Sequence, residues 1–289
     1  MVNLTSFRLV RVSGVSVGQI LDFFESAPHL CKVKLDSITP VPGAEKGRLV
    51  PLVCLKRMDI TGGESSSPLL DHILVPVGAH LTIWVNLPAP PIEHHPPRFF
   101  QNLRNLHGFT AIELHGDDGY PHMEFSGPSG EVTLVLITPH DNEACLVLES
   151  LAHFDTSKTE QLRIDLNDAT PPDLLHQALL PMKDLHSLTL TYSQNPLVLI
   201  HLLDPTMSPP IVVCPKLEEL VINHWKKPDV MDVIGMAAAR ESRGARLKLV
   251  RTISRLKSID VLELKKHVLH VECGHDIEVD DYSDSGGGD

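Results

Sequence analysis

Residues 214–222 read Cys-Pro-Lys-Leu-Glu-Glu-Leu-Val-Ile, and from Leu217 onward they follow the pattern apolar-x-x-apolar-x-apolar. This spacing places Leu220 and Ile222 on one face of an extended strand and the residues between them on the other face. Three further clear copies begin at Leu30, Leu55 and Leu185. A strand that recurs in this way predicts a repeat architecture, which must be recognised before any catalytic motif is considered.

Weaker copies extend the pattern along the chain. Marked by their first positions, the copies begin at residues 4, 30, 55, 78, 109, 131, 159, 185, 217, 244 and 268. Neighbouring copies are about 26 residues apart, which is within the repeat lengths of leucine-rich-repeat proteins. A strand, a helix and a tight return cannot bury their own apolar face, so such units are expected to stack on one another.

The segments between the strands carry helix signals. Two apolar stripes have helical spacing, one made by Val17, Ile20, Leu21 and Phe24 and the other by Val230, Val233, Ile234 and Ala237. Ser16 with Gln19, and Thr170 with Asp173, predict capped helix starts. A further helix is expected to open at Ser67, and proline or glycine ends several of these segments.

These signals together predict an α/β fold. We expect residues 1–275 to form a leucine-rich-repeat-like solenoid, with a curved parallel sheet on the concave side and helices and loops outside. The proline-rich stretch 88–97 and the stretch 204–215 are interpreted as surface loops. Residues 276–289 are expected to form an acidic disordered tail.

Composition limits the possible functions. Apolar residues make up 42% of the 289 residues and aromatic residues only 4%, so the expected core is aliphatic. The net charge of -12 argues against nucleic-acid binding. Five cysteines without a CxxC pair favour free thiols. Because no signal peptide or apolar run of about 18 residues occurs, we expect a soluble cytoplasmic or nuclear protein with no membrane partner.

The run at 214–222 resembles the leucine-rich-repeat region of F-box proteins, in which Cys-Pro-x-Leu-x-x-Leu-x-Leu recurs before the strands. Residues 27–35 and 181–190 are similar, and the irregular repeats with an acidic tail look most like the fungal F-box-like group. The resemblance implies a substrate-recognition region of a ubiquitin-ligase receptor. In that family a separate F-box binds a Skp-type adaptor, but no F-box motif occurs in this sequence, so we expect either a truncated chain or a paralogue.

Three sequence motifs have the residue types of catalytic or metal sites. Residues 14–18 match the G-x-S-x-G pattern of a hydrolase nucleophile, but Ser16 is better explained as a helix cap. Two groups contain residues that metals accept: His267, His270, Cys273 and His275, and His115, Asp117, Asp118 and His122. The first group is expected to diverge and the second to form a turn. We therefore expect no enzyme activity, no cofactor and no metal.

The expected binding surface is the exposed side of the strands. Its predicted residues are Arg8, Lys32, Lys34, Asp36, Arg57, Asp59, His80, Trp84, Glu113, Arg163, Asp165, Thr189, Glu219, Asn223, Arg246, Lys248 and Glu272. Basic residues predominate only in the first three repeats, and a tryptophan follows one repeat later. We therefore expect Arg8, Lys32, Lys34, Arg57 and Trp84 to bind an acidic peptide, with the chain's own tail as a subsidiary candidate.

The expected function is a non-catalytic protein–protein interaction module that selects substrates for a ubiquitin ligase. Two alternatives stay open. One is a free-standing repeat scaffold or inhibitor with no ligase link, which would use the same surface. The other is a hydrolase that uses Ser16 or a histidine-rich metal site.

Overall fold

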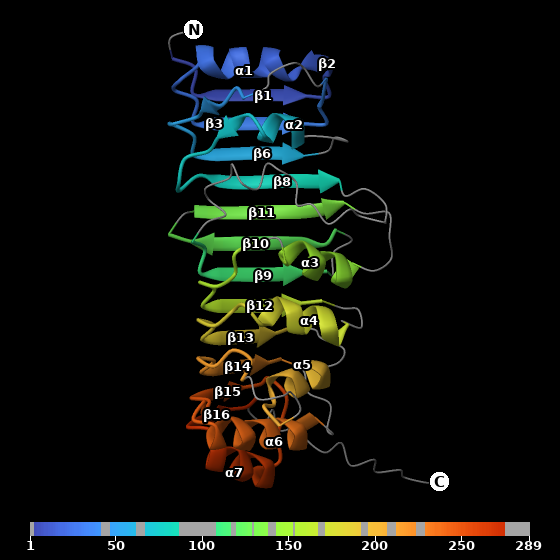
Figure 1. Ribbon diagram of the computed structural model, residues 1–289, viewed down its shortest axis with the longest axis vertical. Helices are drawn as coiled ribbons and strands as arrows, with labels where there is room; N and C mark the ends of the chain where they lie inside the picture. The colour runs from blue at the N-terminus through green and yellow to red at the C-terminus, as the bar shows by residue number, and fades with distance from the viewer. Residues whose placement is uncertain are drawn as a thin grey trace, which may run out of the picture.

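The computed structural model describes residues 3–41, 47–61, 67–86, 108–116, 120–128, 130–137, 143–152, 154–166, 171–191, 196–206, 212–223 and 229–274 (Figure 1). The described strands build one large, open and mostly parallel sheet, so the expected α/β class is confirmed. In spatial order its strands are β1 (Ser6–Val10), β3 (Lys32–Asp36), β6 (Arg57–Thr61), β8 (His80–Asn86), β11 (Gly130–Ile137), β10 (His122–Gly127), β9 (Ala111–His115), β12 (Gln161–Asp165), β13 (Ser187–Leu190), β14 (Glu219–Ile222), β15 (Leu249–Arg251) and β16 (His270–Glu272).

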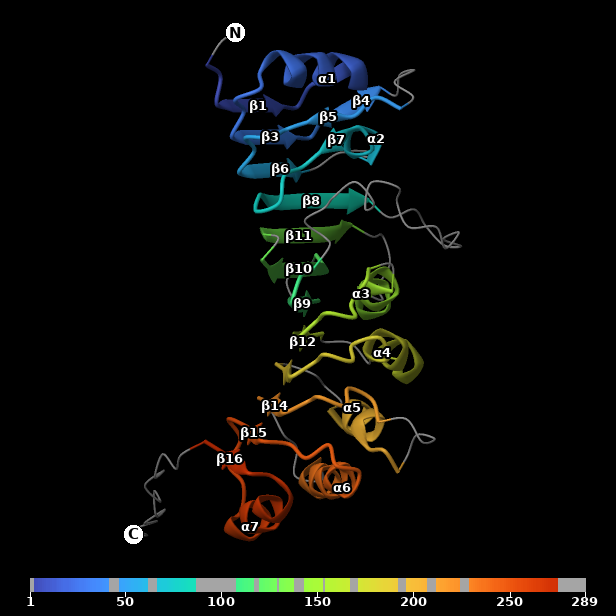
Figure 2. The same cartoon turned by 60° about the vertical axis from the view of Figure 1, so that its left-hand side comes forward.

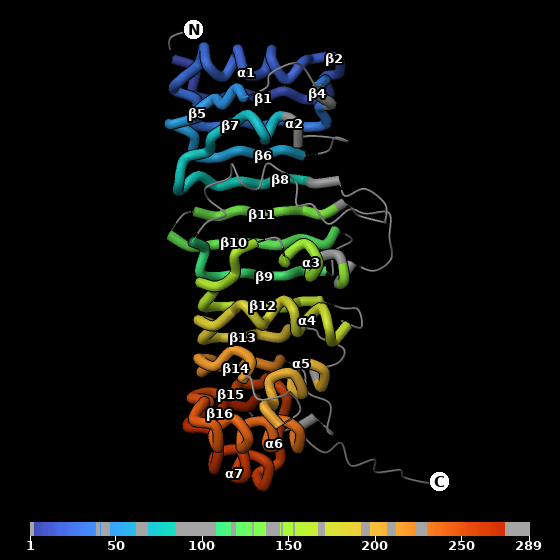
Figure 3. The backbone as a smooth tube through the Cα atoms, in the orientation of Figure 1, coloured from blue at the N-terminus to red at the C-terminus, as the bar shows by residue number. Residues whose placement is uncertain are grey.

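Helices lie along one face of this sheet (Figure 2). They are α1 (Val17–Ser26), α2 (Ser67–Leu70), α3 (Glu143–Leu151), α4 (Pro172–Leu179), α5 (Pro196–Leu203), α6 (Asp229–Ser242) and α7 (Ser258–His267). Two small ribbons join β2 (Ser13–Ser16) to β4 (Thr39–Val41) and β5 (Val50–Pro51) to β7 (Ile73–Leu74). Strands β1 and β16 lie at opposite ends of the sheet (Figure 3). No described helix covers the opposite face, which we call the open face.

The strands are aligned so that apolar side chains form continuous rows across the sheet. One row runs through Phe7, Val33, Met58, Leu81, Val132, Phe125, Ile112, Leu162, Leu188, Leu220, Val250 and Val271. A parallel row two residues further on begins at Leu9 and ends at Ile222, and most members of both rows are buried. A slip of one residue would expose the whole set, so the apolar pattern specifies the register.

The sequence prediction of an all-parallel sheet is wrong at the centre, because β10 runs antiparallel to both neighbours. The chain places β9 three strand positions beyond β8 and then fills the gap with β10 and β11, so that β11 pairs with β8. The tight connection at residues 127–130 joins β10 to β11. Its glycines are required by close packing: a Cβ at Gly127 would lie 2.9 Å from the Thr110 amide nitrogen, and one at Gly130 would lie 2.9 Å from the Ala79 carbonyl oxygen.

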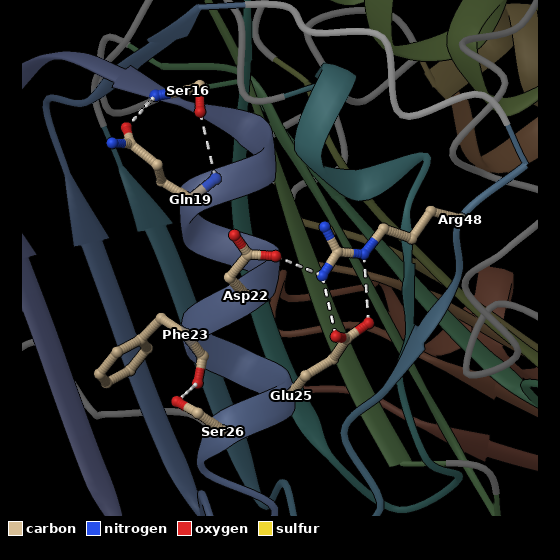
Figure 4. Close-up of polar contacts among 7 residues, drawn as sticks. All are labelled: Ser16, Gln19, Asp22, Phe23, Glu25, Ser26 and Arg48. Atoms are coloured by element: carbon tan, nitrogen blue, oxygen red, sulfur yellow. Dashed lines mark hydrogen bonds and ion pairs between the residues drawn. The ribbon is translucent and has the colours of Figure 1, made fainter.

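Helix α1 confirms the predicted cap and stripe. The Ser16 hydroxyl oxygen accepts the Gln19 amide at 3.1 Å, and the Gln19 side-chain oxygen accepts the Ser16 amide at 3.0 Å (Figure 4). The predicted apolar stripe of this helix is buried. On the outer side, Arg48 pairs with Glu25 and Asp22, and these hydrogen bonds raise the pKa of the guanidinium (Figure 4).

The turn that begins the run at 214–222 is held by a buried arginine from the following helix. Arg240 in α6 has no exposed surface, and it donates to the carbonyl oxygens of Val213 at 3.0 Å and Cys214 at 2.8 Å. Cys214 has a φ of 49°, so its carbonyl is presented from a backbone conformation that is uncommon for a residue with a side chain. Burial lowers the pKa of Arg240 and raises that of the Cys214 thiol to about 12.

Several local expectations need correction or lie outside the described residues. Pro171, without a side-chain hydrogen bond, occupies the cap position of α4, whereas Thr170 is outside the described ranges. In the weak repeat at 244, the pattern placed Leu249 on the buried face of the sheet. Leu249 instead pairs with Glu219 and His270 on the open face, and Val250 is the buried residue. The stretch 88–97, part of 204–215 and the tail 276–289 are also outside the described ranges. Within those ranges, no helix has the length and apolar character needed to cross a lipid bilayer.

Candidate functional site

The open face carries the side chains that alternate with the buried rows. Its central row consists of Arg8, Lys34, Asp59, Thr82, Thr133, Glu124, Glu113, Arg163, Thr189, Val221, Arg251 and Glu272. Strands are spaced about 4.8 Å apart, so neighbours in this row are within side-chain reach. Most members are polar or charged, and a row of side chains held by a rigid sheet can recognise an extended partner.

The N-terminal end of the open face is basic. Lys32 and Arg57 are directly opposite each other on β3 and β6, and Arg8 and Lys34 are opposite each other on β1 and β3. Arg57 also pairs with Asp59 at 3.1 Å, which partly neutralises it. Among the residues that the structure describes, no ion pair neutralises Arg8, Lys32 or Lys34. Arg8, Lys32, Lys34 and Arg57 were all predicted to bind a partner, and the strand pairing places them on one surface, which we call the basic end.

Trp84 lies on the same face, one strand beyond Arg57 and toward the carboxyl end of β8. Its ring packs on Tyr120 with centroids 5.2 Å apart and planes tilted by 50°. Tyr120 precedes β10 and is half exposed, so the two rings form an aromatic patch between the basic end and the centre of the sheet. The sequence pattern suggested Trp84 but gave no reason to select Tyr120.

The centre of the open face gathers histidines and carboxylates from three neighbouring strands. Glu113 and His115 are on β9, Glu124 and His122 on β10, and Asp165 on β12 (Figure 1). The His115 and His122 rings are stacked, with centroids 4.5 Å apart and planes 11° apart. The nearest donor atoms of Glu113, His115 and Glu124 all lie within 4.8 Å of one another. We call these five residues the central cluster.

The sequence named only part of the central cluster. His115 and His122 belonged to a candidate metal group that was interpreted as a turn, and their expected companions Asp117 and Asp118 lie outside the described residues. Asp165 was expected to be exposed but is only 9% exposed. The available signal was the alternation His-x-Glu at 122–124, opposite Glu-x-His at 113–115. These segments meet only because β10 is antiparallel, which the repeat pattern did not reveal.

The other histidine group is divided between elements. His267 ends α7, where its Nδ1 lies 2.8 Å from a Glu241 carboxylate oxygen, whereas His270 is exposed on β16. Cys273 follows that strand, and His275 is outside the described residues. Of the remaining predicted surface residues, Arg246 and Lys248 precede β15 rather than belonging to it. Arg246 donates to the carbonyl oxygens at the end of α7, and Lys248 pairs with Glu218.

The Ser16 hydroxyl oxygen accepts the Gln19 amide hydrogen bond that caps α1, so removing this hydroxyl should destabilise the protein. Ser16→Ala should lower the free energy of unfolding by about 1 kcal/mol, because the Gln19 amide loses its acceptor. Chemical denaturation measures the loss. Ser26→Ala is the matched control, since the Ser26 hydroxyl only adds a bond to the Phe23 carbonyl at the other end of α1. Hydrolysis of an activated ester that wild type performs and Ser16→Ala does not would show instead that Ser16 is a nucleophile.

Neither a protein-family model nor a curated protein matches this sequence. The assignment of a function therefore depends on the geometry of the open face.

Proposed function

We propose that the chain is a non-catalytic protein-binding module that receives an acidic segment of its partner on the basic end of the open face. The observation that carries this proposal is the alignment of Arg8, Lys32 and Lys34 on adjacent parallel strands, with no described helix over them. An extended acidic peptide could place its carboxylates along these strands. The Trp84–Tyr120 pair offers an apolar contact nearby, of the kind that often dominates binding energy.

For the fold, we further propose that the α/β sheet is the strand layer of a leucine-rich-repeat-like solenoid. Three observations support it: strands recur about every 26 residues, neighbouring strands from β12 to β16 follow the sequence order, and helices lie on one face only. In such an architecture the exposed strand face is an extended, preformed binding surface.

A link to ubiquitin ligation is the most specific form of this proposal, and it is supported only by the resemblance of residues 214–222 to F-box leucine-rich repeats. In that form the module selects substrates, and a separate F-box would recruit a Skp-type adaptor. The alternative is a free-standing scaffold or inhibitor that uses the same face. Pull-down with a Skp-type adaptor should fail for this chain as given, and it should succeed with the natural protein only if an F-box precedes these residues there.

Charge reversal on the basic end tests the binding surface itself. The double variant Lys32→Glu/Lys34→Glu should weaken binding of a fluorescent Asp/Glu-rich peptide at least tenfold, because two attractive contacts become repulsive. Fluorescence anisotropy with the full chain measures the dissociation constant. Binding should also weaken as salt increases, since the exposed charges are screened.

The matched control is Lys265→Glu/Lys266→Glu on α7, which changes the net charge equally at exposed positions away from the basic end. This control should change the dissociation constant by less than about twofold. Equal weakening by both double variants would mean that the peptide responds only to total charge, and no binding by wild type would also refute the proposed surface.

A further inference from the structure

We propose that two histidines and two glutamates on the β9–β10 pair bind one divalent transition-metal ion on the open face. Glu113, His115 and Glu124 already have ligand atoms within 4.8 Å of one another, and His122, whose ring is stacked on His115, is the fourth ligand in this proposal. This site is separate from the basic end and does not depend on the proposed peptide binding. Imidazole and carboxylate groups together suit zinc and its neighbours better than calcium or magnesium, which prefer oxygen ligands alone.

The distances within the central cluster are close to those that coordination needs. Glu113 Oε2 lies 3.4 Å from His115 Nε2. Two ligands of a tetrahedral zinc ion with bonds of 2.0–2.1 Å are about 3.4 Å apart, so these two atoms are already spaced as ligands. His122 Nε2 lies 3.8 Å from Glu124 Oε1. The two imidazole rings are stacked nearly parallel, and His115 already lies with Glu113 and Glu124, so a turn of the His122 ring is needed for both histidines to bind the same ion.

Hydrogen bonding prepares His122 for this role. Its Nδ1 lies 3.2 Å from the carbonyl oxygen of Tyr120, so this nitrogen carries the proton and donates it to the carbonyl. In neutral imidazole the other nitrogen, Nε2, then keeps its lone pair, and Nε2 is the atom that faces Glu124. Histidine ligands of metals commonly have their second nitrogen hydrogen-bonded in this way.

Asp165 gives a second, independent indication of a cation site. This residue is only 9% exposed, and among the described residues its buried Oδ1 has no hydrogen-bond partner. Its other oxygen lies 3.9 Å from His115 Nδ1, so the carboxylate borders the cluster from β12. A buried carboxylate oxygen without a partner is costly. A cation bound to His115 would stabilise it, and Asp165 would then act as a positioning residue that orients the imidazole.

The charge balance also favours a divalent ion. Glu113, Glu124 and Asp165 contribute three carboxylates, and among the described residues Arg163 is the cation that faces them, with its Nη1 3.6 Å from Glu113 Oε2. With neutral imidazoles, two negative charges remain uncompensated. A divalent ion neutralises them, and Arg163 contacts the same Glu113 oxygen that lies nearest to His115 Nε2.

Zinc titration of the full chain by isothermal calorimetry tests the site. The chain has 17 histidines, so weak binding of further zinc ions elsewhere is expected. The test is therefore the difference in zinc affinity between wild type and the variants. Wild type should show one strong zinc site, and Ca²⁺ and Mg²⁺ should not displace zinc from it. His115→Ala and the isosteric Glu124→Gln should each weaken that site at least tenfold, and Asp165→Asn should weaken it by about tenfold through His115.

The matched control is His80→Ala, which removes another histidine–glutamate pair from the same face, since His80 Nδ1 lies 2.9 Å from Glu131 Oε2. This control should leave the strongest zinc site unchanged. Glu124 is 47% exposed at its side chain, so Glu124→Gln should fold normally, as circular dichroism can verify. Unchanged zinc affinity in His115→Ala and Glu124→Gln, equal weakening in His80→Ala, or displacement by Ca²⁺ would each overturn the proposal.

Discussion

Gly130→Ala is expected to lower the free energy of unfolding by about 3 kcal/mol, because two separate features exclude a side chain there. Gly130 has a φ of 111°, a conformation that residues with a Cβ rarely adopt. A Cβ would also lie 2.9 Å from the Ala79 carbonyl oxygen and 3.1 Å from the Gly78 backbone. Since these neighbours are backbone atoms, they cannot move without disturbing the start of β8. Urea denaturation followed by circular dichroism measures the change.

The opposite result is expected for Gly235→Ala in α6. Gly235 is exposed inside a helix, and a Cβ there would meet no heavy atom within 4 Å apart from its chain neighbours and the backbone of its own helix. Alanine should therefore stabilise the protein by about 0.5–1 kcal/mol through helix propensity. Comparison of Gly130→Ala with Gly235→Ala therefore distinguishes a local steric clash from a general effect of replacing glycine by alanine. If Gly130→Ala were as stable as wild type, the close approach of the β10–β11 turn to residues 78–79 would be wrong.

Arg240→Met should destabilise the protein by about 2–3 kcal/mol, although methionine keeps much of the buried volume. The change removes the donors to the Val213 and Cys214 carbonyl oxygens and leaves both buried acceptors less well satisfied. It also removes the cost of burying a guanidinium, so the expected loss is smaller than the two hydrogen bonds alone would suggest. Equilibrium denaturation in urea provides the measurement.

Arg243→Met, three residues further along, is the appropriate control. Arg243 is exposed just after the end of α6, and the same substitution there should change the free energy of unfolding by less than about 0.5 kcal/mol. A neutral result for Arg240→Met would indicate that desolvation cancels the two hydrogen bonds. The arginine would then contribute no net stability to the turn at Cys214.

Periodicity predicted most of the fold because it records which side chains must be buried. The alternation around Leu188 and Leu220 specifies strands and their inward faces, and the stripe that includes Ile20 specifies α1. The central reversal could not be predicted in this way, because a strand buries the same face whichever direction it runs. The segment 122–127 has only the short alternation Met123 and Phe125, and it falls between two predicted repeats.

The candidate sites show the same limit. The basic residues of the first strands could be placed on one face because their spacing relative to the buried rows is regular. The central cluster depends on pairing between β9 and β10, which aligns Glu113 with Glu124 and His115 with His122 across an antiparallel ladder. Arg240 was likewise hidden, since α6 shows an apolar stripe but nothing in its pattern identifies which polar residue turns inward.

The central reversal also affects the order in which the protein can assemble during synthesis. Strand β8 ends at residue 86, but its partner β11 begins only at residue 130, after β9 and β10 have left the ribosome. Until then the nascent N-terminal portion presents β8 as an unpaired border to which other chains can attach. Formation of the β10–β11 hairpin therefore covers the exposed edge of β8. Through β9, which pairs with β10, the hairpin also provides the edge on which β12 pairs.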